Sequence, residues 1–245
     1  MKTLSTLPIL GVLAVATAVG RADTVTVNAT DVVYAAGSQS NLGSGGTLFT
    51  NSGGGTLPVD ITLTPGGSFF TFSATGSVSM DGLHFGDADG TTARVATSSN
   101  TGFGSISGIT APGAGYLVGV FIGPGGPTGA APTALDFATT SFTTLSPLLD
   151  QAFFIGDGLT GDGTGTVQDF VIPTGATALY LGFSDAGGFN GAPFDYGDNL
   201  GSLSVNYTET VPAPTGVTPE PSSLLLLGTG VVGALTMVRR RLTGR

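Results

Sequence analysis

The sequence contains no cysteine and no tryptophan, and it has a single histidine, His84, and a single lysine, Lys2. Without cysteine, the chain forms no disulfide and has no thiolate for catalysis or metal binding. A serine nucleophile needs a positioned base, and neither the lone histidine nor a lysine is set in such a motif. We therefore expect no enzymatic activity, although the many aspartates leave a paired-carboxylate hydrolase open as an alternative.

Positive charge is also scarce, since charged residues make up only 9% of the chain and the net charge is −9. Between Asp23 and Pro219 there are fifteen acidic residues, fourteen of them Asp, and one basic residue, Arg94, which gives −14 for that stretch. Such a field repels phosphate backbones and argues against nucleic acid as a partner. It attracts cations, Ca²⁺ above all, because carboxylate oxygens are hard ligands. The same acidity also promotes solubility, so composition alone leaves both readings open.

The N-terminus has the three parts of a secretory signal peptide. Lys2 precedes an apolar run over 7–19. A cut between Ala22 and Asp23 would have small residues, Gly20 and Ala22, at the third and first positions before it. The alternative is a membrane-spanning helix, but the run is shorter than the roughly 18–20 residues that a span needs. We expect residues 1–22 to be removed on export.

The C-terminal segment has the features of a membrane anchor. Residues 222–238 are apolar over 17 positions, just long enough to span a bilayer as a helix. The basic tail 239–245 follows and stays in the cytoplasm by the positive-inside rule. The preceding stretch 209–221 is rich in proline and is expected to be an extended stalk.

Pro219-Glu220-Pro221 stands directly before this apolar segment and its arginine cluster. The three-part pattern resembles the PEP-CTERM sorting domain, and a plain tail anchor would not need the Pro-Glu-Pro motif. The resemblance implies that an exosortase-type membrane enzyme recognises Pro219, Glu220 and Pro221. It also implies export across the inner membrane, transient anchoring, and a final place at the cell surface, in the extracellular matrix or in the medium.

The stretch 23–208 is predicted to be a β domain. Apolar and β-branched runs are separated by clusters of Gly, Pro, Asp and Asn, which is typical of short strands joined by turns. One short helix fits within 145–154. The fold class expected is all-β, a jelly-roll-like β-sandwich. The predicted strands cover 24–28, 59–63, 69–78, 116–122, 153–155, 170–172, 178–183 and 202–207.

The loop over 184–200 is the densest group of oxygen ligands, and strands are predicted on both sides of it. Calcium takes six to eight oxygens from carboxylates, amide carbonyls, main chain and water. Gly197 permits the sharp turn that lets neighbouring side chains converge. The candidate side-chain ligands are Asp185, Asp195, Asp198 and Asn199.

The same unit is similar to bacterial calcium-dependent galactose-binding lectins of the PA-IL type. The matching motifs are Asp185, then Tyr196-Gly197-Asp198-Asn199, then Gly201-Ser202-Leu203-Ser204-Val205, with weaker matches at 63–66 and 112–119. The resemblance implies a small jelly-roll sandwich in which Asp185, Asp198 and Asn199 bind calcium through side chains. It places Asp195 near a main-chain ligand position and a further carbonyl around Met80. The metal would hold a galactoside or extracellular polysaccharide through two sugar hydroxyls.

The resemblance has departures, and each residue has a plainer interpretation. Asp198 stands where that family has Asn, and the segment 124–166 has no counterpart. Asp and Asn also simply make turns by bonding their own backbone. Tyr196 and His84 are candidate ligand contacts, whereas Phe189 and Phe194 serve equally well as sugar contacts or as core anchors of the loop. A matrix or surface protein with the same sandwich and no ligand therefore stands as the alternative function.

Overall fold

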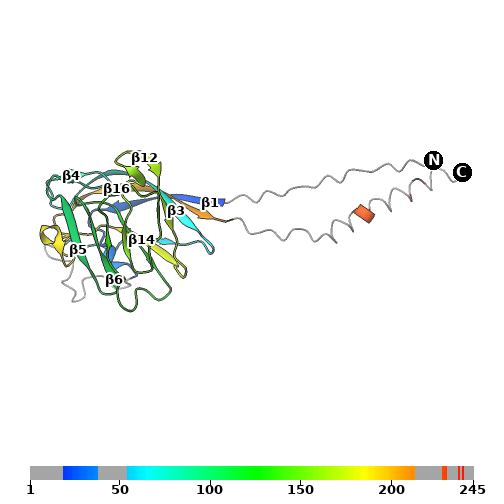
Figure 1. Cartoon of the computed structure of the whole chain (residues 1–245), viewed down its shortest axis with the longest axis horizontal. Coiled ribbons are helices and arrows are strands. Elements are labelled where there is room, and N and C mark those ends of the chain that lie inside the picture. Colours follow the sequence, from blue (N-terminus) through cyan, green and yellow to red (C-terminus); the bar gives the residue numbers. More distant parts are fainter. Residues whose placement is uncertain (1–18, 38–53, 213–227, 231–236, 238, 240–245) are drawn as a thin grey trace. The chain divides into compact units, whose positions relative to one another are not determined.

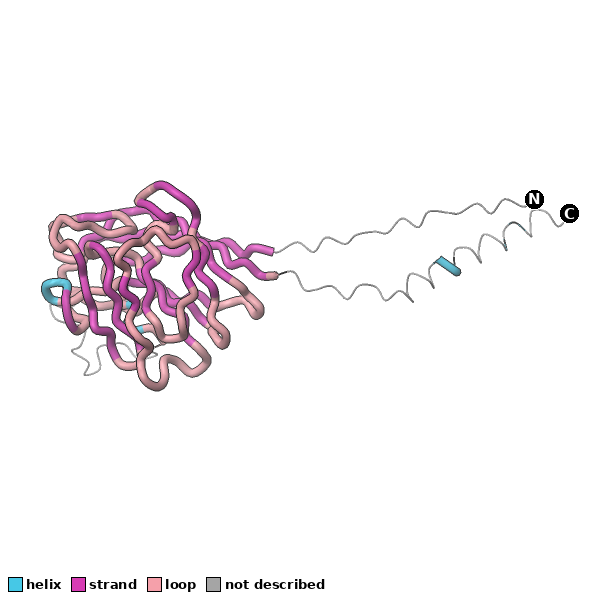
Figure 2. Tube along the Cα trace, in the orientation of Figure 1, coloured by secondary structure: helices cyan, strands magenta, loops and turns pink. Residues whose placement is uncertain are grey.

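The computed structural model describes residues 19–37, 54–212, 228–230, 237 and 239. Val19–Val211 forms one compact unit, and the chain outside it forms a second unit. The regular secondary structure of the first unit consists of strands, joined by loops, and of 3-10 turns at Val33–Ala35 and Gly187–Phe189 (Figure 2). The all-β prediction for the exported domain is confirmed.

The largest sheet carries both ends of the domain. Its order is β1-β16-β3-β13-β9, with β4 also paired to β3. Figure 1 shows β1 and β16 side by side, and their antiparallel ladder runs from Val19↔Val211 to Asn28↔Ser202. The strands are β1 (Val19–Asn28), β3 (Phe69–Ser79), β4 (Phe85–Gly86), β9 (Thr144–Leu145), β13 (Asp169–Val171) and β16 (Leu200–Val211).

A second sheet packs against the first through phenylalanine rings. The ring of Phe70 in β3 lies 6.2 Å from that of Phe121, and Phe170 lies 5.7 Å from Phe153, measured between centroids. All four side chains are fully buried, and Gly119 leaves room for the Phe153 ring, which would lie 2.6 Å from a Cβ there. The strands, in sheet order, are β10 (Ala152–Phe154), β7 (Val118–Ile122), β14 (Ala178–Gly182) and β2 (Val59–Thr62).

A third sheet and a small hairpin complete the domain, and the segment 124–166 contributes to both. That segment is therefore part of the folded domain and contains short strands of its own. The third sheet has the order β15 (Asn190–Gly191), β5 (Thr97–Phe103), β6 (Ile106–Pro112), β8 (Leu135–Asp136), and the hairpin pairs β11 (Leu159–Gly161) with β12 (Thr164–Val167).

One expectation about elements was wrong, and two of the longer strands were not predicted. The short helix over 145–154 does not form; that stretch instead holds the end of β9, a bridge between Leu149 and Phe121, and β10. Pro147 breaks a helix there, and Phe153 and Phe154 enter the core. Strands β5 and β6 were missed because their glycine, serine and threonine content obscures the alternation that signals a strand.

The boundaries of the domain also differ from the expected 23–208. β1 begins at Val19, and β16 extends to Val211, three residues into the expected stalk. Glu209 is fully buried there and accepts hydrogen bonds from the Thr64 backbone N–H (2.8 Å) and hydroxyl (2.7 Å). These bonds to the 64–67 turn hold the end of the strand in the sheet.

The predicted signal peptide and membrane helix lie mainly outside the described residues. Of the signal peptide, only residues 19–22 are described, and of 222–238 only 228–230 and 237, which are helical. Within the part of the chain that the structure describes, no helix is both long and apolar enough to cross a membrane.

Candidate functional site

The loop predicted to bind calcium connects β14 to β16 at the end of the sheet opposite Val211. Its central anchor is Tyr196, which is completely buried. The Tyr196 hydroxyl accepts a hydrogen bond from the Asp185 N–H (3.0 Å) and donates one to the Phe183 carbonyl (3.2 Å). Phe194 N–H donates to the Asp185 carbonyl (3.0 Å). These bonds fix the start of the loop against its end.

Asp185 is the most unusual acidic residue of the loop, because it is only 2% exposed. Its Oδ1 accepts a hydrogen bond from the Ala186 N–H (2.8 Å), whereas its buried Oδ2 has no hydrogen-bond partner. Burial raises the pKa of this carboxyl to about 8, although the Ala186 N–H and the polar side chain of Asn199 oppose the rise. The nearby charges of Asp198 and Asp195 raise it further. A carboxylate here is therefore poorly compensated by the protein.

Asn199 faces Asp185 from the far end of the loop and is 4% exposed. Its amide donates a hydrogen bond to the carbonyl of Ala29 (3.0 Å), just beyond β1. Its Oδ1 is buried and has no hydrogen-bond partner. The structure thus brings together two of the four predicted side-chain ligands, and each has one unpartnered oxygen.

The surroundings of Asp185 contain hydroxyl groups. Burial is the main cause of a raised pKa for Tyr34, Tyr116 and Tyr196, to about 12 for Tyr116, and the charge of Asp185 raises all three further. The ion pairs at Asp81 do not involve Asp185, and no cation is among the groups that shift the pKa of Asp185. A carboxylate at this place meets neutral hydroxyls and other acids.

Asp195 and Asp198 lie on the outer side of the loop, half-buried and exposed respectively. Asp195 adopts a left-handed backbone conformation with φ of 82°, an uncommon one for a residue other than glycine. Burial raises the pKa of Asp198, and the charges of Asp195 and Asp81 add to the rise. The carboxylates of Asp185, Asp195 and Asp198 do not all lie within 4.8 Å of one another.

Met80 and His84 flank a tight turn that follows β3. Met80 is buried, and the backbone at Gly82 lies against the Asp198 carbonyl, which would be 3.2 Å from a Cβ at Gly82. The turn therefore lies beside the loop, as expected from the sequence. His84 is partly exposed, and its Nδ1 lies 2.7 Å from Asp81 Oδ2.

Asp81 was missed by sequence reasoning, although it organises this turn. Burial alone would raise its pKa, but hydrogen bonds donated by the His84 and Leu83 backbone N–H groups, the His84 ring and the Ser79 hydroxyl hold the pKa well below its usual range. Arg94 Nε lies 3.8 Å from the same carboxylate. Asp81 is thus already balanced by the protein. The Asp-Gly pair at 81–82 is a turn signal that would have identified it.

The expectation that the Tyr196 ring contacts a ligand was wrong. The side chain has no exposed surface, and its hydroxyl is engaged with the backbone. Phe189 is also buried. Both rings anchor the loop in the core, which for Phe189 was the alternative interpretation.

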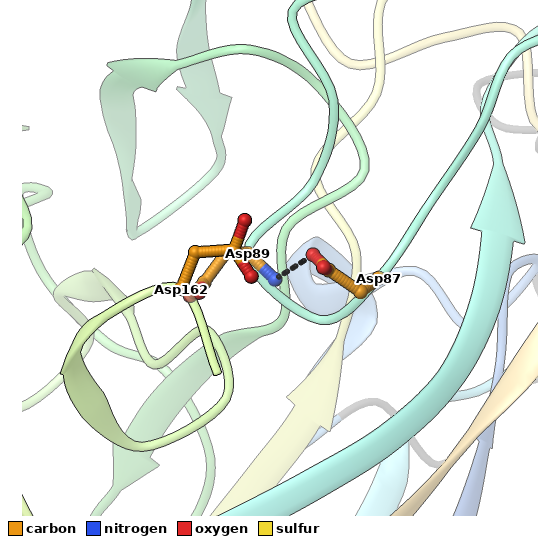
Figure 3. A group of neighbouring side chains, drawn as sticks. All are labelled: Asp87, Asp89 and Asp162. Atoms are coloured by element: carbon orange, nitrogen blue, oxygen red, sulfur yellow. Dashed lines mark hydrogen bonds between the residues drawn. The ribbon is translucent and has the colours of Figure 1, made fainter. Parts of the chain in front are cut away.

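A second acidic group is made by Asp87, Asp89 and Asp162 (Figure 3). Their carboxylate oxygens lie within 4.8 Å of one another. Asp87 and Asp89 follow β4, and Asp162 lies in the turn between β11 and β12. The Asp89 N–H donates to Asp87 Oδ1 (3.1 Å), and Asp89 Oδ1 accepts from the Asp157 N–H (3.1 Å).

This group differs from Asp185 in its contact with water. Asp87 and Asp162 are exposed and Asp89 is half-buried, beside an open hollow of about 380 Å³. Burial raises the pKa of Asp89 to about 6, and the charges of Asp157, Asp87 and Asp162 raise it further. Asp162 lies far along the chain from Asp87 and Asp89, so no local sequence pattern indicates that the three carboxylates come together.

Comparison with known proteins identifies the C-terminal segment. Residues 217–241 match the PEP-CTERM protein-sorting motif. The predicted motif residues Pro219, Glu220 and Pro221 fall in this match, although they lie outside the described residues. No curated protein sequence shows significant similarity to the chain. The chain therefore carries a PEP-CTERM sorting motif, which marks an exported protein that an exosortase processes at the membrane before its release to the surface or beyond.

Proposed function

We propose that the exported domain is a calcium-assisted carbohydrate-binding module. The observation that carries this proposal is the pair of buried, unpartnered oxygens, Asp185 Oδ2 and Asn199 Oδ1. Leaving a buried polar atom without a partner costs about 1–3 kcal/mol, so such atoms are rare without a reason. A hard cation between the two residues removes both costs, because carboxylate and amide oxygens are the ligands that calcium prefers.

The charge around the loop favours the same ion. Asp185 has no cationic partner among the described residues, and the neighbouring Asp195 and Asp198 add negative charge. A divalent ion offsets this repulsion. Calcium accepts irregular sets of six to eight oxygens, including main-chain carbonyls and water, so three clustered carboxylates are not required. The carbonyls near Met80 and Asp195 are the proposed main-chain ligands.

Carbohydrate is the proposed ligand because one side of the loop is open to solvent. Asp185 and Asn199 are buried, but Asp198 is exposed and Asp195 half-buried, so an ion shared by all four residues would meet water only on the side of Asp195 and Asp198. Two sugar hydroxyls replace such waters without loss of ligand oxygens. A galactoside is the sugar class that the motif resemblance suggests, and the partly exposed ring of His84, in the turn beside the loop, is the proposed contact to it.

The position of the loop in the fold suits an extracellular ligand. Asn199 precedes β16, whose far end at Val211 leads into the sorting tail. With about 3.3 Å per residue, the strand separates the two ends by about 36 Å. The proposed ligand site therefore lies at the opposite end of the domain from the point at which the tail begins.

Isothermal titration calorimetry on the full-length protein in detergent tests the proposal. We expect heat and a stoichiometry of one when Ca²⁺ is added to the chelator-treated protein. Galactose then binds only in the presence of Ca²⁺, and an Asp185→Asn variant loses both signals. Glucose, which differs from galactose at one hydroxyl, serves as the matched control sugar.

Two outcomes would reject the proposal in different ways. If Ca²⁺ gives no heat, or binds Asp185→Asn as well as the native protein, the metal site is elsewhere or absent. If Ca²⁺ binds at this loop but neither galactose nor an extracellular polysaccharide binds after it, the ion has a purely structural role.

A further inference from the structure

The first strand of the domain begins before the cleavage point expected from the sequence. All ten residues of β1 pair with β16, starting with Val19 opposite Val211. A cut between Ala22 and Asp23 removes four of these ten residues. The corresponding end of β16 then pairs only with β3, and its other edge is left with unpaired backbone groups.

Residues of the segment 19–22 also make contacts that depend on their identity. Gly20 lies against the methyl group of Thr208, which would be 3.1 Å from a Cβ at Gly20. The Arg21 guanidinium donates a hydrogen bond from Nη1 to the carbonyl of Thr62 in β2 (3.2 Å), which ties the first sheet to the second. These are the contacts of a segment that belongs to the folded domain.

The sequence offers a second cleavage point immediately before this strand. Ala16-Thr17-Ala18 places alanine at both the third and the first positions before a cut, and the apolar run precedes it directly. That is the small-residue pattern which ends a secretory signal peptide. Sequence patterns alone do not separate the two points, because Gly20 and Ala22 are also small.

We propose that the export signal is cleaved between Ala18 and Val19, so that the exported protein begins with the first residue of β1. The proposal rests on the expectation that the N-terminus is a signal peptide, and it is independent of the calcium site. Cleavage at this bond keeps the whole β1–β16 ladder and the Arg21 bond to Thr62. It also keeps β16 paired on both sides as far as Thr210, one residue before the end of the strand.

The test is the N-terminal sequence and intact mass of the protein after export. The full-length precursor is produced in a bacterial host that exports and cleaves signal peptides, and the product is purified from outside the inner membrane. We expect an N-terminus at Val19. A product that begins at Asp23, or a full-length uncut product, would overturn the proposal.

Two matched variants test the assignment separately. Ala18→Leu places a large residue directly before the proposed cut, and we expect uncut precursor to accumulate. Ala22→Leu changes the other alanine, which is exposed in β1, and we expect normal cleavage with Val19 at the N-terminus. Loss of cleavage in Ala22→Leu with normal cleavage in Ala18→Leu would assign the site to Ala22 instead.

Discussion

The two acidic regions of the domain differ in what surrounds their carboxylates. In the group of Asp87, Asp89 and Asp162, three carboxylates lie close together, but two of them are exposed. In the loop of Asp185 and Asn199 the carboxylates are further apart, but Asp185 is 2% exposed and carries an unpartnered oxygen. Water satisfies the first group and has little access to the second. The proposed cation site is therefore the loop, where buried oxygens lack partners, and not the group with more neighbouring acids.

Replacement of Asp185 should have the largest effect, which is on the thermal stabilisation by Ca²⁺. If the replacement had no effect, the contrast between the two acidic regions would not hold. At Ca²⁺ concentrations 100-fold above Kd, binding stabilises a protein by about 2.7 kcal/mol. For a domain of this size that corresponds to a rise in Tm of about 5–10 °C. We expect the rise in the native protein and none in Asp185→Asn, as measured by thermal unfolding with Ca²⁺ and with chelator. Equal Ca²⁺ responses in both proteins would contradict the assignment.

The pH dependence of the free energy of unfolding, measured in chelator, should distinguish the loop of Asp185 from the group that contains Asp89. Both Asp185 and Asp89 have raised pKa values in the folded protein, to about 8 and about 6. The folded state therefore binds more protons than the unfolded state, and the free energy of unfolding falls as pH rises. We expect Asp89 to contribute to this fall in the free energy of unfolding between about pH 4 and 6. Asp185 should contribute to it up to about pH 8.

The measurement is denaturant unfolding at a series of pH values in chelator. Asp185→Asn should remove the fall in stability between about pH 6 and 8, and Asp89→Asn should leave that part of the curve unchanged. A native curve that is flat from pH 6 to 8 would show that Asp185 titrates normally.

The Tyr196 hydroxyl should contribute to the free energy of unfolding, because its hydrogen bonds to the backbone of Phe183 and Asp185 join the end of the loop to its start. Tyr196→Phe keeps the ring but leaves the Asp185 N–H without its acceptor. We expect a loss of about 1–3 kcal/mol in the free energy of unfolding. Tyr180→Phe is the matched control, because the Tyr180 hydroxyl forms a longer, exposed bond to Asp60 (3.3 Å). A loss of the same size in both variants would show that burial of the loop is not the cause.

The smallest effect is expected at the exposed group. Asp162→Asn removes one of three neighbouring charges that water already solvates, so the free energy of unfolding should change by less than about 0.5 kcal/mol. Its response to Ca²⁺ should equal that of the native protein in the same thermal measurement. If this variant lost the Ca²⁺ response, the cation site would be the group of aspartates shown in Figure 3 and not the loop.

Much of the candidate site was predictable from local pattern. Asp185 and Asn199 were identified because they lie just after one strongly patterned strand and just before another. Those strands, β14 and β16, belong to different sheets, so the approach of the two residues depends on how the sheets pack. The burial of the Tyr196 side chain was not predictable, because an aromatic ring next to a glycine in a polar loop can either contact a ligand or pack in the core. The approach of Asp162 to Asp87 and Asp89 was not predictable either, because it arises only through packing of a hairpin from a distant part of the chain.

The sequence by itself determined that the protein is exported and sorted and that its domain is made of strands. Export and sorting signals act as linear motifs, and strand formation follows from residue alternation, so neither needs a tertiary contact. Only the tertiary structure decided which acids are deprived of water, which rings are buried, and that the domain begins at Val19. Those properties depend on pairing between residues as far apart as Val19 and Val211, and no local pattern contains that information.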